Sequence, residues 1–272
     1  MIRRILTFAS LIVLLATFHS CAKQEVVENQ GLDQSVLNRI EALGFSSEGA
    51  AVTEGGYLVE GDIFLTEQDL NAVFDIQSLI IGNAEQYRTA QLVTGMPRVV
   101  TVFINVGTGG KKLPLSYGTA LDIAIARYNA EPMELDFLRV SSSGADIDIV
   151  KVSGSYLASA GFPTSTGDPF NSIKVNSSAI GDGSTNTFHN YVATILAHEI
   201  GHCIGMRHTD YMDRSYSCGG STSNEGASTV GAILIPGTPA SADAGSWMLA
   251  CIGSLQNRPF NPNDKTALDF LY

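Results

Sequence analysis

The chain has 272 residues, 44% of them hydrophobic and 16% charged, so it can bury a sizeable core in one large domain, with or without a smaller segment. Its formal net charge is −11 at pH 7. Phosphate backbones and anionic lipid surfaces repel an acidic protein, and we therefore expect no nucleic-acid partner.

The N-terminus, residues 1–20, is typical of a targeting segment. Arg3 and Arg4 precede the apolar run Ile5–Phe18, which is too short to span a bilayer comfortably. A small residue followed by Cys21 resembles a bacterial lipoprotein signal, in which Cys21 would become the lipidated N-terminus. An ordinary secretory signal is the alternative. Either predicts export: an outer-membrane or cell-surface lipoprotein that touches the membrane only through its anchor, or a protein secreted after processing.

The next part of the chain carries several short elements. Residues 22–32 are polar and predict a tether. Asp33–Gly44 has an N-cap residue, a 3.6-residue apolar stripe and a terminal glycine, which predict a short helix. Ala51–Leu65 predicts extended structure, and Thr66–Asp69 a capping-box-like helix start. Residues 82–97 show no clean periodicity.

From residue 98 onward the apolar pattern is stronger, and its period alternates between that of strands and that of helices. The expected elements are, in order, a strand at 98–106, a helix at 114–128, strands at 133–137 and 146–150, a short strand at 173–175, a helix from about residue 188, and a C-terminal helix at 261–272. Residues 209–244 are rich in Gly, Ser and Thr, which predicts loops.

One stretch has the pattern H-E-x-x-H-x-x-G-x-x-H. On a helix, His198 and His202 share a face and can bind one metal ion. Gly205 can adopt a left-handed turn that ends the helix and returns His208 as a third ligand. Three protein ligands leave one tetrahedral position of zinc open, as in catalytic sites, and Glu199 lies where a general base is needed. The alternative of surface histidines on a helix is disfavoured, because three of the chain's five histidines fall in this stretch.

This long form of the motif resembles the metzincin clan of zinc endopeptidases, and the order of the expected elements matches their N-terminal subdomain. Ala145–Ile149 resembles the A-D-I-x-I strand of matrixins, and Leu157–Pro163 resembles their edge strand, which lies antiparallel to the substrate. The substrate-strand residues implied are Leu157, Ala158, Ser159 and Ala160. Ser246-Trp247-Met248 fits the turn that places a methionine, here Met248, beneath the ligands.

The letters of His198–His202 are those that name the dual-action HEIGH metallopeptidases, a bacterial group that the chain resembles. The resemblance implies an α+β, metzincin-like fold: a twisted mixed sheet, two long helices above the active-site cleft, and a loop-rich C-terminal subdomain. It also implies a monomeric endopeptidase acting on proteins or peptides, with one catalytic zinc ion.

Val59–Ile63 resembles the F-x-G-D segment of astacin propeptides, in which the aspartate occupies the water position on zinc and keeps the enzyme latent. Asp62 is therefore a candidate latency ligand, since a carboxylate can be the fourth zinc ligand. On this interpretation residues 21–97 form a tether and prosegment, and residues 98–272 form the catalytic domain. The alternative is a hairpin turn with a solvated Asp62.

Three cysteines follow Cys21, and an exported protein pairs what it can. We favour a Cys218–Cys251 disulfide, with Cys203 as a small core residue, although sequence alone leaves the connectivity open.

Two further assignments come from comparison with astacins and matrixins. Tyr211 is a candidate for oxyanion support, because the tyrosine that follows the methionine turn in astacins is missing here. The loop Asp182-Gly183-Ser184 is a candidate calcium site by comparison with matrixins, although one such loop is usually just a turn.

The leading hypothesis is zinc-dependent hydrolysis of peptide bonds with Glu199 as the general base. A surface lipoprotein that binds a glycan or protein around a non-catalytic zinc site is the rival, and the intact Glu199 argues against it. Zinc-dependent hydrolysis of an ester or lactone is a third alternative.

Overall fold

The fold is that of a computed structural model of the full chain, which describes residues 31–43, 45–71, 86–225, 231–239 and 241–272. The predicted signal, Cys21 and most of the predicted tether lie outside the described residues. Among those described, no helix is both long and apolar enough to cross a membrane.

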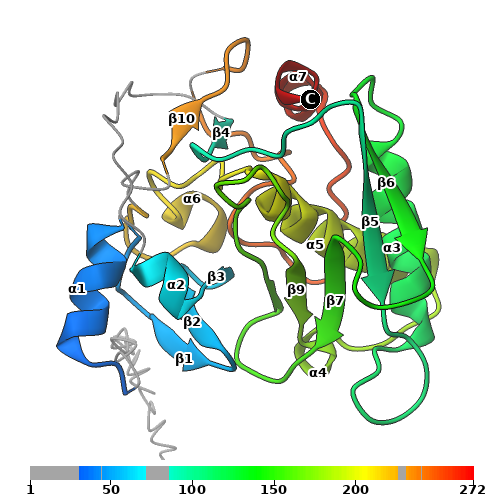
Figure 1. The fold of residues 1–272 in the computed structure, drawn as a ribbon, viewed down its shortest axis with the longest axis horizontal. Coiled ribbons are helices and arrows are strands. Elements are labelled where there is room, and N and C mark those ends of the chain that lie inside the picture. The colour runs from blue at the N-terminus through cyan, green and yellow to red at the C-terminus, as the bar shows by residue number, and fades with distance from the viewer. Residues whose placement is uncertain (1–30, 44, 72–85, 226–230, 240) are drawn as a thin grey trace, which may run out of the picture.

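Residues 31–71 form an N-terminal unit with its own small core (Figure 1). Its elements are α1 (Gln34–Ala42), β1 (Ala51–Thr53), β2 (Gly56–Val59), β3 (Ile63–Leu65) and α2 (Glu67–Leu70). The predictions for this part are confirmed. The Asp33 side chain accepts the backbone N–H of Ser35 and caps α1, while Thr66 and Asp69 form a reciprocal capping box on α2. The three strands pair antiparallel in the order β1-β2-β3.

The main sheet is five-stranded and mixed, in the order β6-β5-β7-β9-β8. Its strands are β5 (Arg98–Ile104), β6 (Leu135–Val140), β7 (Ile147–Lys151), β8 (Ala158–Ser159) and β9 (Ser172–Val175). Four of them run parallel, and the edge strand β8 pairs antiparallel with β9. The strand predicted at 133–137 begins only at Leu135, because the N–H of Glu134 bonds to the carbonyl of Tyr272 instead of joining the sheet.

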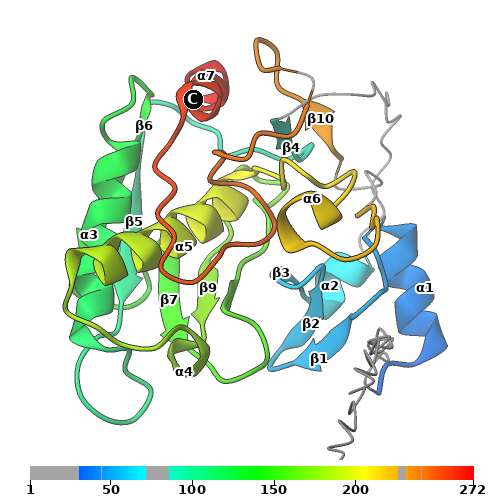
Figure 2. The ribbon, with the colours of Figure 1, turned by 180° about the vertical axis from the view of Figure 1, so that it is seen from behind.

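Two long helices, α3 (Leu115–Tyr128) and α5 (Asn186–Ile204), cover one face of this sheet (Figures 1 and 2). The short helix α4 (Ser177–Ile180) precedes α5. Buried apolar side chains of both long helices and of the inward face of the strands form the main core. The other sheet face exposes Val99, Leu138 and Val150. The predicted mixed α+β architecture with a sheet and two long helices is confirmed.

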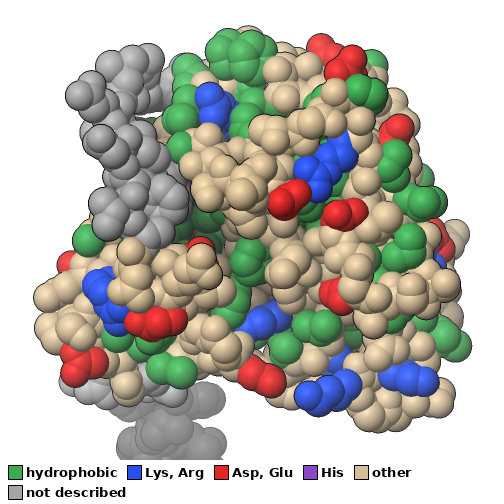
Figure 3. Space-filling model, in the orientation of Figure 1, with side chains coloured by type: hydrophobic (Ala, Val, Ile, Leu, Met, Phe, Trp, Pro, Cys, Tyr) green, Lys and Arg blue, Asp and Glu red, His purple; other side chains and the backbone are tan. Residues whose placement is uncertain are grey.

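The part after α5 is mostly loop, as predicted. It holds α6 (Ser215–Cys218), the strand β10 (Ile233–Leu234), which pairs with β4 (Tyr87–Arg88), and the terminal helix α7 (Pro262–Leu271). Cys218 and Cys251 form a disulfide, and Cys203 is a free, buried thiol in α5. On the face drawn in Figure 3, acidic and basic side chains are interspersed.

Candidate metal centre

The helix α5 carries His198, Glu199 and His202, all buried. It ends at Gly205, whose φ of 107° places it in the left-handed region, as predicted from the sequence. A side chain there would also press on Leu92 and on the backbone of Gln91. The turn reverses the chain and brings His208 back to the other two histidines.

Each histidine is held from behind through its Nδ1 atom. His198 Nδ1 lies 2.9 Å from the carbonyl of Trp247, His202 Nδ1 lies 2.9 Å from the carbonyl of Met206, and His208 Nδ1 lies 2.7 Å from Glu225 Oε1. Carbonyl and carboxylate oxygens only accept hydrogen bonds, so each Nδ1 carries the proton. All three Nε2 atoms therefore present lone pairs, which is the tautomer that a metal ligand needs.

The Nε2 atoms converge on one point. His202 Nε2 lies 3.0 Å from that of His198 and 3.2 Å from that of His208. Three facing lone pairs cannot hydrogen-bond to one another, so the cluster needs a cation. Tetrahedral ligands about 2.0–2.1 Å from a zinc ion are separated by about 3.3 Å, close to what is observed. The donor set therefore fits a zinc ion.

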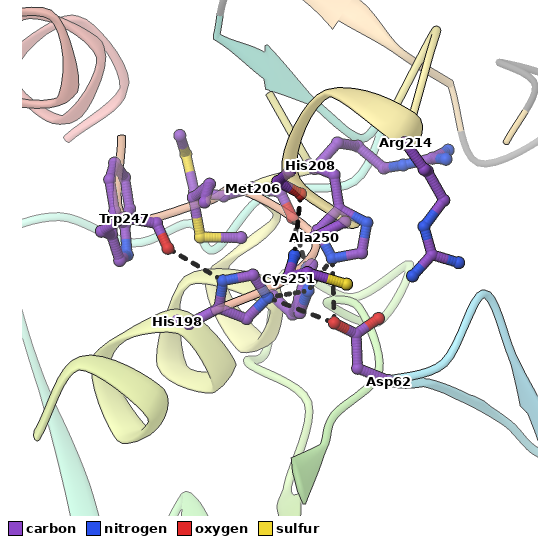
Figure 4. A network of polar contacts seen from close by, with 12 residues as sticks. Asp62, His198, Met206, His208, Arg214, Trp247, Ala250 and Cys251 are labelled. Carbon is purple, nitrogen blue, oxygen red and sulfur yellow. Dashed lines mark hydrogen bonds and ion pairs between the residues drawn. The ribbon is translucent and has the colours of Figure 1, made fainter. Parts of the chain in front are cut away.

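Asp62 supplies a fourth donor from the N-terminal unit (Figure 4). Its Oδ2 lies 3.1 Å from His208 Nε2 and 3.4 Å from His198 Nε2. Glu60 and Gly61 both have positive φ, 53° and 87°, and this turn aims Asp62 at the histidines. Burial opposes ionisation of Asp62, but positive charge at the cluster, which a proton on His208 supplies when no metal ion does, holds the pKa of Asp62 well below its usual value. The structure thus brings the candidate latency residue to the three predicted ligands.

The turn that contains Met248 lies under α5. A Cβ on Gly201 would come within 2.6 Å of Met248 Sδ, so only glycine allows this approach between the two helical ligands. Buried Asp264 supports the turn by accepting the Ser246 hydroxyl at 2.9 Å and the Trp247 N–H at 3.3 Å. Met248 therefore lies against α5 at Gly201, between the two helical histidines in sequence.

Glu199 is 3% exposed, and its Oε2 has no hydrogen-bond partner among the described residues. Burial, together with the negative charge of Asp62, raises the pKa of this carboxyl well above its usual value. Glu199, His198 and Asp62 all line a cavity of about 200 Å³. A proton acceptor therefore lies beside the metal-binding nitrogens and faces space that a substrate can enter.

Behind His208 lies a buried ionic cluster that sequence reasoning missed. Glu225 Oε1 lies 3.0 Å from Arg214 Nε, and Glu225 Oε2 lies 3.6 Å from Arg207. Arg207 also lies 3.5 Å from Glu60 of the N-terminal unit. Although burial opposes its ionisation, these cations and His208 hold the pKa of Glu225 below its usual value. Of the residues in this cluster, only Arg207 lies inside the metal-binding motif, so only its position in the sequence could have indicated a role at the site.

The predicted substrate strand lies at the sheet edge as β8, and its free side meets the N-terminal unit. The Ala160 N–H donates to the carbonyl of Asp62 at 3.0 Å, and the Phe64 N–H donates to the carbonyl of Ala160 at 2.8 Å. Leu157 and Ala158 line the cavity beside Glu199. The edge that would receive a substrate backbone is thus partly occupied by the segment that carries Asp62.

Two other predicted residues lie elsewhere. Tyr211 packs edge-on against Tyr87, with ring centroids 4.4 Å apart, and is not among the residues that line the cavity. Asp182 accepts hydrogen bonds from the Ser116 hydroxyl and the Gly183 N–H, and belongs to neither metal-capable group of His, Cys, Asp or Glu found among the described residues. The geometry supports neither the oxyanion role nor the calcium site.

Three imidazoles, a carboxylate on the fourth side and a buried proton acceptor define a mononuclear metal centre of hydrolytic type. The chain belongs to the dual-action HEIGH metallopeptidase family, whose model matches residues 57–272. The predicted family is thereby confirmed, and the protein is a metallopeptidase, a hydrolase of proteins or peptides.

No curated protein matches the chain. Solved structures resemble it, among them two of myroilysin. "Structure of Myroilysin" is 16% identical, covers 66% of this chain and 82% of that chain, and has a TM-score of 0.42. "Crystal structure of myroilysin" is 16% identical, covers 65% and 83%, and has a TM-score of 0.40. At such low scores these likenesses carry no argument about the site.

Proposed function

We propose that this chain is a zinc-dependent endopeptidase, exported as a latent precursor and anchored through a lipid on Cys21. The observation that carries the proposal is the four-donor cluster of His198, His202, His208 and Asp62, with Glu199 beside it. Residues 21–97 would be the tether and prosegment, and residues 98–272 the catalytic domain.

A zinc ion held by the three histidines would polarise the scissile carbonyl and make water more acidic. Glu199 Oε2 then accepts a proton from the attacking water and passes it to the leaving nitrogen. The edge strand from Leu157 to Ala160 would hold the substrate backbone by adding a strand to the sheet. Met248 would support the histidines through its contact with Gly201 on α5.

Latency follows from the position of Asp62. Its carboxylate takes the side of the cluster that water needs, and its neighbours occupy the backbone of Ala160. Both contacts come from the N-terminal unit, so removing or displacing that unit would free the fourth position and the sheet edge together.

The test compares three full-length, zinc-loaded proteins on unfolded casein: the natural chain, Asp62→Ala, and Asp62→Ala combined with Glu199→Gln. We expect little cleavage by the first. The second should cleave slowly and in a chelator-sensitive way, because its fourth position is open while the sheet edge is free only when the N-terminal unit moves away. The third should not cleave although it still binds zinc. Glu48→Ala, at an exposed position of the N-terminal unit, is the control and should match the natural chain. Cleavage by the double variant would sink the role of Glu199.

The anchor is tested separately. Cys21→Ser should abolish lipid labelling and release the protein from the membrane fraction. N-terminal sequencing of the natural product should give Cys21 for an anchored precursor, or a residue near Arg98 for a processed enzyme. A start elsewhere within residues 1–20 would contradict lipidation at Cys21.

A further inference from the structure

The cavity beside Glu199 and His198 is small and distinct in its lining. Its volume of about 200 Å³ is below the range of roughly 300–1,000 Å³ found for drug-sized ligands, so it suits a single side chain. Because it borders Glu199 and the edge residues Leu157 and Ala158, a side chain held there belongs to a substrate residue next to the bond that is cut.

Much of the cavity wall is apolar. The apolar lining residues are Leu157, Ala158, Ile195, Trp247, Leu249, Ala250 and Ile252. Such a wall favours the methylene groups of a substrate side chain. Apolar area alone would make the cavity a pocket for an aliphatic residue, but its polar groups point to a different ligand.

Within the described part of the chain, two hydrogen-bond donors in the lining, on Arg258 and Tyr156, have no acceptor. Arg258 is 8% exposed; its Nη1 donates to the carbonyl of Cys251 at 2.8 Å and its Nη2 to Gln256 Oε1 at 3.1 Å. Its Nε, and the buried hydroxyl of Tyr156, have no hydrogen-bond partner among the described residues. A buried donor without a partner is costly, so these groups favour a ligand that brings acceptor oxygens.

The wall that carries Arg258 is fixed from behind. The Ala250 N–H donates to Asp210 Oδ1 at 2.9 Å, and the Cys251 N–H donates to Ser217 Oγ at 3.0 Å. The disulfide ties Cys251 to the neighbouring loop. The guanidinium is therefore preorganised and loses little freedom on binding a ligand.

The charges agree with this chemistry. Among the described lining residues, Arg214 and Arg258 are basic, and Asp62 and Glu199 are acidic. His198 also lines the cavity, and Arg214 and Asp62 are labelled in Figure 4. Asp62 belongs to the N-terminal unit. When that unit is displaced, Glu199 remains with the two arginines, and Glu225 already offsets the charge of Arg214. Arg258 is then the lining cation that has no ion pair among the described residues, and it attracts a negative charge.

We infer that this cavity is a specificity pocket for a glutamate side chain beside the scissile bond, with Arg258 as the specificity-determining residue. The substrate's methylene groups lie on the apolar wall, and its carboxylate accepts from Arg258 Nε and Tyr156 Oη. The inference rests on the proposed function and names its substrate class: proteins or peptides with a glutamate next to the cleaved bond.

The test uses the full-length, zinc-loaded Asp62→Ala protein. Cleavage sites in unfolded casein are first mapped by mass spectrometry, and peptides are then made with Glu, Gln or Leu at each position flanking the bond. We expect kcat/KM for Glu to exceed that for Gln by about tenfold or more at one position, because a buried charged pair is stronger than a neutral hydrogen bond. Arg258→Met should lower the Glu-to-Leu ratio by a similar factor, with Arg258→Lys intermediate. Arg139→Met, a surface arginine paired with Asp122, should leave the ratio unchanged.

Equal cleavage of the three peptides would overturn the inference, as would an Arg258→Met protein that loses activity on all of them equally. If that variant does not fold, the natural Glu-to-Gln ratio and Tyr156→Phe, which should lower it severalfold, decide the question. Cleavage that needs metal and Glu199 but ignores the flanking charge would remove only this inference. Absence of any metal-dependent cleavage would remove the proposed function as well.

Discussion

The three histidines and the carboxylate that faces them are held by different parts of the molecule. The partners of the histidine Nδ1 atoms, Trp247, Met206 and Glu225, all lie beyond residue 98. Asp62 stands on the N-terminal unit, which packs around a separate core. The difference teaches that the groups that orient the histidines and the carboxylate that faces them come from separate parts of the chain, so the fourth donor can leave while the Nδ1 partners of the other three stay in place.

The joint between the two parts is made of mixed contacts, among them the buried ion pair of Arg207 and Glu60. Two backbone hydrogen bonds meet at Ala160, and the ring of Phe45 stacks on that of Phe162 at 6.2 Å. Lys174 Nζ lies 3.4 Å from the centre of the Phe64 ring. Such a joint resembles a domain interface more than a shared core, and relative motion is the ordinary expectation for it.

Removing a histidine should have the largest effect. His202→Ala should weaken zinc binding by roughly a thousandfold or more, since it removes a central ligand from a site whose total binding energy is large. Asp62→Ala should weaken it much less, because three anchored histidines remain. Zinc affinities measured on the full chain by competition with a chelating dye compare the two. Equal losses would show that Asp62 is as integral to the site as the histidines.

The second-largest effect should be on the pH dependence of stability. It should arise in the part of the molecule that holds the histidines and not in the N-terminal unit. Burial raises the pKa of Asp264 from 3.8 to about 7. The folded state then keeps a proton that the unfolded state releases, so stability from this group is fully present below about pH 4 and is lost as pH rises towards 7. The loss is about 4 kcal/mol at about 1.4 kcal/mol per pKa unit.

The measurement is urea unfolding between pH 4 and 8, followed by the fluorescence of Trp247, the single tryptophan of the chain, whose backbone N–H bonds to Asp264. Asp264→Asn should flatten the pH dependence relative to the natural chain. Parallel curves for the two proteins would show that Asp264 does not carry the effect.

Glu225 should have a smaller effect, on zinc affinity, because it acts through His208. Its carboxylate fixes the ring and tautomer of the third ligand, and losing such support typically costs 10- to 100-fold in metal affinity. Glu225→Gln should therefore weaken zinc binding by about that factor, with the fold retained. Glu48→Gln, an exposed glutamate, is the matched control. An unchanged affinity in Glu225→Gln would mean that His208 is positioned by packing alone.

These residues differ in how far sequence could locate them. His198, His202 and Gly205 are predictable because helix geometry and glycine's left-handed turn act over a few residues. Asp62 could be suggested by a short local pattern, but only the tertiary structure places it 3.1 Å from His208. The same short pattern is equally compatible with a hairpin turn in which Asp62 is solvated.

The sequence alone could not place Glu225, Arg258 and Asp264 near the site. Each reaches the site from a loop or helix start far along the chain, and no fixed spacing relates it to the motif. Tyr211 shows the opposite error: it lies three residues after His208, yet its ring turns towards Tyr87. Proximity in sequence predicts proximity in space only where regular structure fixes the direction of the side chain.

The smallest expected effect lies at the joint itself. Lys174, on β9, donates to the carbonyl of Glu54 at 2.5 Å and covers the ring of Phe64, so it binds two parts of the N-terminal unit at once. A cation over an aromatic ring contributes about 0.5–2 kcal/mol. Lys174→Met should therefore raise the open population by roughly 2- to 30-fold, and the rate of limited proteolysis within the N-terminal unit by the same factor when opening is fast. Zinc affinity should not change, because Lys174 touches none of the histidines or their partners among the described residues. Lys111→Met, in an exposed loop, controls for the lost charge. If Lys174→Met altered zinc binding and proteolysis together, the two parts would form one cooperative unit, and displacement of Asp62 would require unfolding of the metal centre itself.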